Sequence, residues 1–79
     1  MKYILTFENT NLAIKSEILL LNIGVNVTVR PLPPIINAGC GIVLAIGEEN
    51  LLECKILLDE SDVTYKIYKT ENNKKYFAI

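Results

Sequence analysis

Cys40 is the residue of this sequence best suited to covalent chemistry, because it stands between Gly39 and Gly41 and the chain contains no histidine. A thiolate is a good nucleophile, and flanking glycines let another molecule approach closely and let backbone N–H groups turn toward the sulfur. No lysine, arginine or histidine adjoins Cys40 in sequence to stabilise a thiolate. The residues alone leave two interpretations open: a reactive, accessible thiol, or a small hydrophobic residue buried at the start of a strand.

The second cysteine, Cys54, has the position of a core residue. Leu51, Cys54 and Leu58 share one face of an expected helix, a spacing typical of packing against a sheet. We expect no disulfide, because Cys54 should lie farther from Cys40 than the ~7 Å between Cα atoms that a bridge tolerates. Two distant cysteines without a histidine cannot form a closed zinc site, so neither a metal nor a cofactor is expected.

The elements that must position Cys40 follow from the hydrophobic pattern. Two segments alternate between apolar and polar residues, and a third is apolar on both faces, as in a central strand. Asn9 or Thr10 should cap the first helix, and Gly24 should end it. The expected elements are strands over 2–7, 25–30, 42–46 and 63–68, helices over 11–22 and 48–59, and a proline-stiffened loop over 31–37.

This β-α-β-β-α-β order predicts an α+β two-layer sandwich of the ferredoxin-like type. Right-handed crossovers should place the first and third strands side by side at the centre, with both helices on one sheet face. The alternating strands predict that the other face is solvated. Asn72-Asn73 favours a tight turn, after which 76–79 forms either a short extra strand or a frayed tail.

The first expected helix has more apolar surface than one sheet contact uses. Ile14, Ile18 and Leu21 form a stripe on the side away from the expected core face, which consists of Leu12, Ser16, Leu19, Leu20 and Ile23, with Ala13 at its margin. An exposed apolar patch often marks a partner surface, so we expect a homodimer or a docking site here. The alternatives are a different core face or a patch too small to matter.

Composition limits the remaining classes of function. The 79 residues suffice for a single domain over 1–79, and a hydrophobic content of 51% favours a packed core. The net charge of -1 argues against a nucleic-acid partner. No apolar run approaches the ~20 residues that span a bilayer, so we expect no membrane partner, a cytoplasmic location and two free thiols.

Three segments together cover nearly the whole chain: Thr6-Phe7-Glu8-Asn9-Thr10, the helix from Ala13-Ile14-Lys15-Ser16-Glu17 through Leu20 to Gly24, and Arg30-Pro31-Leu32-Pro33 leading to Gly39-Cys40-Gly41. They resemble a family of small bacterial proteins described as putative selenium/sulfur carrier-like. In that family the Cys-Gly pair entering a strand is the suggested sulfur-bearing position, which corresponds to Cys40 and Gly41. Family members tend to have a basic residue where this chain has Pro34, and Arg30 is the candidate substitute.

The resemblance implies a carrier of sulfur or selenium, and not a stand-alone enzyme. A cysteine desulfurase-like donor would place a persulfide-type sulfur on Cys40, and an acceptor protein would remove it. Gly39, Gly41 and Arg30 are the expected supporting residues. A second hypothesis, from a different class, is a small interaction or sensor module in which Cys40 is structural and the stripe on the first helix recruits a partner.

Overall fold

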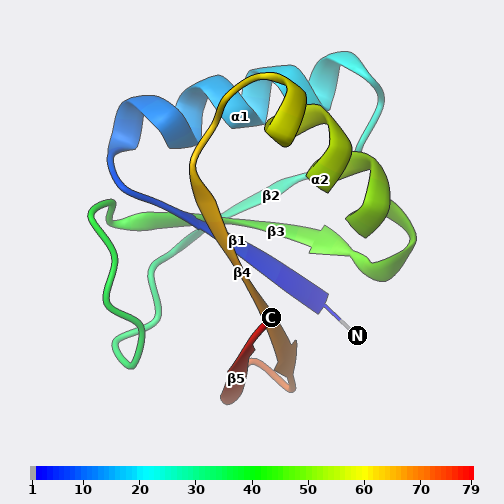
Figure 1. The fold of residues 1–79 in the computed structure, drawn as a ribbon. Helices are drawn as coiled ribbons and strands as arrows, with labels where there is room; N and C mark the ends of the chain where they lie inside the picture. The colour runs from blue at the N-terminus through cyan, green and yellow to red at the C-terminus, as the bar shows by residue number, and fades with distance from the viewer. Residues whose placement is uncertain (1) are drawn as a thin grey trace.

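The computed structural model describes residues 2–79 (Figure 1). Asn9 caps the first helix, because its side chain accepts a hydrogen bond from the Leu12 amide at 2.9 Å. The elements in chain order are β1 (Lys2–Phe7), α1 (Thr10–Asn22), β2 (Thr28–Pro31), β3 (Ile42–Gly47), the 3₁₀ helix η1 (Glu48–Asn50), α2 (Leu51–Glu60), β4 (Tyr65–Glu71) and β5 (Lys75–Ala78).

Within residues 2–79 five strands form one antiparallel sheet in the order β2-β3-β1-β4-β5. Strands β1 and β3 lie side by side at the centre, and Figure 1 shows both helices on one face of the sheet. The ferredoxin-like prediction is therefore confirmed. The C-terminal segment is a strand, β5, which follows a turn with positive φ at Asn72 and Asn73.

Strand β2 is later and shorter than the expected 25–30. Helix α1 ends in a Schellman motif, in which Gly24 has a φ of 82° and the Val25 amide donates to the Leu20 carbonyl. Val25 is thereby held against the core instead of in the sheet. At its other end β2 includes Pro31, which an edge strand tolerates because alternate residues direct their N–H groups away from the neighbouring strand.

The core has two parts, one on each face of the sheet. The larger cluster lies between the sheet and the helices and includes Leu5, Leu20, Leu44, Cys54 and Leu58. The smaller one lies on the opposite face, with Ile4, Ile36, Val43 and Ala45, and has Leu32, Tyr68 and Tyr76 packed against it. The prediction of a solvated second face is therefore wrong in part. The loop between β2 and β3 places Ile36 on that face, so the chain covers it without a third layer.

Helix α1 also presents a somewhat different face to the sheet than expected. Ala13, Ser16 and Leu20 are buried, whereas Ile23 is about half exposed. The face of α1 that packs on the sheet is therefore centred on Ala13, Ser16 and Leu20. Ile23 is not part of this face because it follows the last residue of the helix.

Candidate functional site

Cys40 lies in the loop between β2 and β3, two residues before β3 begins at Ile42. Its Sγ donates a weak hydrogen bond to the Thr10 hydroxyl at 3.5 Å, and Thr10 is the first residue of α1. Helix α1 begins directly after β1, and β3 pairs with β1. These two arrangements bring Cys40 and Thr10 together although they are thirty positions apart in sequence. The thiol therefore lies at the N-terminal end of α1.

The Cys40 side chain is buried in this structure. Only 3% of the residue is exposed, and it belongs to the cluster between the sheet and the helices. Gly39 and Gly41 on either side of it are both exposed. In the folded state Cys40 is thus a small buried residue just before a strand. Its two neighbours in the sequence are nevertheless exposed to solvent.

The two glycines beside Cys40 differ in whether the surrounding structure leaves room for a side chain. The Gly39 Cα packs directly against the Glu8 backbone, so that a Cβ at residue 39 would collide with the Glu8 carbonyl oxygen. At Gly41 a Cβ would meet no atom within 4 Å. Within residues 2–79 positive φ occurs at Gly24, Asp62, Asn72 and Asn73, so neither glycine beside Cys40 has the left-handed conformation of an anion-binding nest.

Arg30 and Cys40 lie on opposite sides of the sheet. Arg30 pairs with Val43 across β2 and β3, and Val43 belongs to the cluster on the face opposite the helices. Directly paired residues share a sheet face, so Arg30 lies on that face while Cys40 lies on the helix side. The resemblance grouped Arg30 with Cys40 as a supporting residue, but the structure places the two on opposite faces of the sheet.

Cys54 is fully buried on the inner face of α2, in the same cluster as Leu58. Burial, together with the nearby Glu53 carboxylate, raises the pKa of the Cys54 thiol to about 11. Both cysteines of the described chain are free thiols, which confirms the prediction of no disulfide. Cys54 is thus kept neutral and inaccessible.

The apolar stripe on α1 is exposed as expected: about half of each of Ile14, Ile18 and Leu21 is open to solvent. Val29 on the edge strand β2 pairs with Leu44, which faces the helices, so Val29 extends this apolar surface along the same side of the sheet. The role of the stripe as a partner surface stays a prediction.

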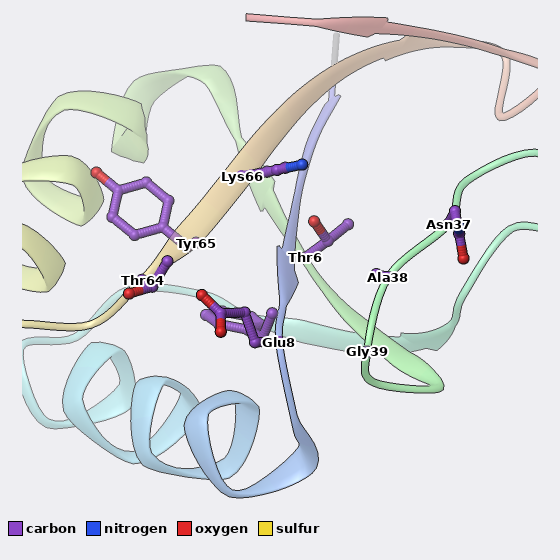
Figure 2. A pocket seen from close by; sticks show the side chains of 9 residues that line it. Thr6, Glu8, Asn37, Ala38, Gly39, Thr64, Tyr65 and Lys66 are labelled. Atoms are coloured by element: carbon purple, nitrogen blue, oxygen red, sulfur yellow. The ribbon is translucent and has the colours of Figure 1, made fainter.

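A small pocket lies beside the Cys40 loop, and the sequence analysis did not predict it. Its volume is about 150 Å³, and the loop segment Asn37–Gly39 forms one wall (Figure 2). Residues at and just outside the ends of β1 and β4 form the rest, namely Thr6, Phe7, Glu8, Thr64, Tyr65 and Lys66. These residues come together only through strand pairing and loop packing. The pocket therefore cannot be predicted from a short sequence motif.

The described residues offer neither a metal site nor a membrane-spanning helix. Across residues 2–79, no three or more side chains of His, Cys, Asp or Glu are grouped so that they could hold a metal ion. None of the helices in this range has the length and apolar character needed to cross a membrane.

Residues 2–69 match the family model described as "Putative Se/S carrier protein-like", which covers most of the chain. No curated protein and no solved structure matches the chain.

Proposed function

Because the chain belongs to the Putative Se/S carrier protein-like family, we propose that it accepts a sulfur or selenium atom on Cys40 and delivers it to an acceptor protein. The observation that best supports Cys40 as the carrying atom is its contact with Thr10 at the start of α1. The N-terminal end of a helix favours negative charge, and a persulfide anion would carry such a charge. Cys54, which is fully buried in α2, offers no comparable position.

The transfer needs no oxidant. The Cys40 thiolate attacks the terminal sulfur of a donor persulfide, R–S–SH, and the donor S–S bond breaks as the new one forms. The donor sulfur leaves as a thiolate and takes up the proton that Cys40 lost, so the products are Cys40–S–SH and R–SH. An acceptor nucleophile then attacks the terminal sulfur and releases Cys40 as a thiol. A cysteine desulfurase-like enzyme is the donor class, and selenium in the terminal position follows the same steps.

Transfer also requires the loop to open, because the donor sulfur must reach an atom that is buried in the closed state. Besides the hydrogen bond from Cys40 to Thr10, the loop is held by the Gly39 backbone on Glu8, the Ile36 side chain in the second cluster, and the hydrogen bond from the Leu32 amide to the Gly41 carbonyl. The segment has no regular secondary structure after Pro31, so it can move without breaking the sheet. We propose that donor docking, with the α1 stripe as its contact surface, accompanies this movement.

The burial of Cys40 favours a second candidate function, a small interaction or sensor module with a structural Cys40. In that case the thiol only fills space beside Thr10, and Ile14, Ile18 and Leu21 on α1 bind a partner or a second copy of the chain. The two candidates differ in whether sulfur is ever bound covalently.

The test is incubation with a cysteine desulfurase and L-cysteine, followed by intact-protein mass spectrometry. The carrier proposal expects a gain of one sulfur that is removed by a thiol reductant. The gain should persist in Cys54→Ala and be absent in Cys40→Ala. An adduct of equal size in Cys40→Ala, or no adduct on the wild-type protein with any donor tested, would contradict the proposal and leave the interaction module.

A further inference from the structure

The sheet has an edge at β2 and another at β5, and the two differ in what they offer to a further strand. At β2 the Leu32 amide donates to the Gly41 carbonyl, so Leu32 and, by alternation, Arg30 direct their backbone groups toward the β3 side. Val29 and Pro31 therefore direct theirs outward, and Pro31 has no N–H to offer. A proline at such a position protects an edge strand against pairing with another chain. The β2 edge is thus partly closed.

Strand β5 forms the other edge and contains no proline. The Ile79 amide donates to the Ile67 carbonyl of β4, and alternate residues of an antiparallel strand direct their backbone groups to the same side. Phe77 therefore bonds toward β4, whereas the N–H and C=O groups of Tyr76 and Ala78 point away from the sheet. Figure 1 shows β5 at this free edge, away from both helices. The outward groups are available to a further antiparallel strand.

The side chains on the helix side of this edge are apolar and exposed. Ile79 lies on that side because it bonds to Ile67 of the helix-side cluster, and Phe77 shares the side by alternation. Both Phe77 and Ile79 are exposed. A hollow of about 600 Å³ lies between α2 and the strands β4 and β5, with Ile67 and Ile79 among its lining residues. Side chains of another chain therefore have room beside β5, and their contact would remove apolar surface from water.

The backbone pattern of β5 is complementary to itself. When two β5 strands lie antiparallel with Phe77 opposite the partner's Phe77, each Tyr76 lies opposite the partner's Ala78. Each of these Tyr76–Ala78 pairs exchanges two hydrogen bonds, so every outward N–H and C=O group of the two residues is used. The two Phe77 residues form a non-hydrogen-bonded pair, in which side chains approach most closely. We infer that the chain forms a two-fold symmetric dimer through β5, in which two five-stranded sheets join into one.

The sizes and charges of the side chains agree with this register. On the helix side the two Phe77 rings form a cross-strand aromatic pair, and on the other side each Tyr76 faces the small Ala78. Lys75 lies opposite the partner's Ile79, at four residues or roughly 13 Å along the strands from the partner's Lys75. That separation exceeds the Debye length of about 8 Å at physiological ionic strength, so the two lysines repel each other only weakly. The register therefore brings apolar side chains together and keeps like charges apart.

The small size of the contact sets the expected strength of the dimer. One short strand from each copy contributes, whereas a standard stable interface buries about 800 Å² per partner. We therefore expect a weak dimer that dissociates in the micromolar to millimolar range.

This inference goes beyond the carrier proposal and does not depend on it. Cys40 precedes β3, and α1 packs over β1 and β3, so both lie away from β5 in the order of the strands. A dimer through β5 leaves the Cys40 loop and the α1 stripe free for a donor.

The test is sedimentation velocity of the wild-type protein from about 10 µM to about 1 mM, where we expect a reversible shift from monomer to dimer. Ala78→Pro removes an outward N–H while leaving the bonds between β5 and β4 in place, and should weaken dimerisation at least about tenfold. Phe77→Lys and Phe77→Glu each place like charges opposite one another at the two-fold axis and should weaken it by a similar factor. An equimolar mixture of these two variants should associate again, because the facing charges are then opposite.

Ile18→Lys is the matched control for Phe77→Lys. Ile18 is 54% exposed and Phe77 51%, but Ile18 lies on the α1 stripe, so its replacement should leave dimerisation unchanged. Dispersed ¹H–¹⁵N spectra of each variant separate a lost dimer from a lost fold.

Three outcomes would overturn the inference. Loss of the dimer in Ile18→Lys but not in Phe77→Lys would make the α1 stripe the interface. A mixture of Phe77→Lys and Phe77→Glu that stays monomeric would exclude the register centred on Phe77. A wild-type protein that stays monomeric up to about 1 mM would leave the β5 edge to a strand of a different protein. The sulfur-transfer assay tests Cys40 separately, so its failure and the failure of the dimer are distinguishable.

Discussion

The two cysteines have almost the same exposure but are buried by different means. Cys54 lies in the middle of α2 and is covered by side chains from both the helix and the sheet. Cys40 lies in an irregular segment whose closed position depends on a few contacts, chiefly Gly39 on Glu8 and Ile36 on the second face. Local opening can expose a loop at a fraction of the free energy of global unfolding, whereas a residue inside a packed helix follows the whole domain. Static exposure therefore says little about which thiol can react.

The largest effect we expect is on the rate of thiol alkylation in the native protein. Cys40 should react through local opening of its loop, and Cys54 only through global unfolding, so their rates should differ by at least about a hundredfold at neutral pH. Single-thiol variants, Cys40→Ala and Cys54→Ala, labelled with iodoacetamide and followed by mass spectrometry, give the two rates separately. Rates in denaturant correct for intrinsic reactivity.

If both thiols were protected equally from alkylation up to the unfolding transition, the Cys40 loop would not open independently of the domain that buries Cys54. In that case Cys40 would be structural, and the interaction module would be the better account of the protein.

The second expected effect concerns the glycines beside Cys40. Gly39→Ala should destabilise the protein by about 1–3 kcal/mol and accelerate Cys40 alkylation, because the new Cβ collides with the rigid Glu8 backbone and the loop must move away. Gly41→Ala adds the same methyl group into open space and should change the free energy of unfolding by less than about 0.5 kcal/mol. Urea unfolding and labelling of both variants make the comparison. A similar loss in both would show that the contact with Glu8 does not hold the loop.

The third effect is a loss of stability at alkaline pH that comes from Cys54. The unfolded thiol ionises near its ordinary value of 9.0, whereas burial raises its folded-state pKa to about 11. Because the folded-state pKa is raised, the neutral Cys54 thiol makes its full contribution to the free energy of unfolding below pH 9. This contribution, about 2 kcal/mol, is lost as the pH rises from 9 to 11. Urea unfolding at several pH values should show this loss in wild type and Cys40→Ala.

Cys54→Ala serves as the control for this slope. It should be less stable at neutral pH but should lose much less stability between pH 9 and 11. Tyr65 adds a smaller loss at higher pH, since burial and its hydrogen bond to Asp59 raise its pKa to about 12. An unchanged slope in Cys54→Ala would assign the effect to other groups.

Much of this architecture could be predicted from local patterns. Alternation over 63–68 predicted a strand that the structure has slightly later, as β4 over Tyr65–Glu71. The spacing of Cys54 and Leu58 predicted the inner face of α2, and Asn72-Asn73 predicted the last turn. Each of these features is encoded within a few consecutive residues, where side-chain period or backbone preference acts directly.

The features around the candidate site could not be predicted in the same way. The hydrogen bond of the Cys40 thiol depends on Thr10, the need for a glycine at residue 39 depends on Glu8, and the pocket depends on the pairing of Thr6 with Lys66. All three join residues that are far apart in sequence, and a single sequence holds no local sign of them. The proline connector predicted a loop, but nothing in it indicated that Ile36 would fold back under the sheet.

The smallest expected effect concerns the C-terminal end of α2. It tests directly whether Cys40 and Cys54 become exposed by different opening events. Asp62 has a φ of 56° at the position where α1 has Gly24, and the Val63 amide closes the same motif on the Leu58 carbonyl. Asp62→Gly should relieve the left-handed strain and stabilise the protein by about 0.5–1 kcal/mol. Because this stabilisation applies to the whole domain, Cys54 alkylation should slow by up to about fivefold, while Cys40 alkylation should keep its rate. If both rates slowed together, Cys40 would open only when the whole domain unfolds, and the loop would not be an independent unit.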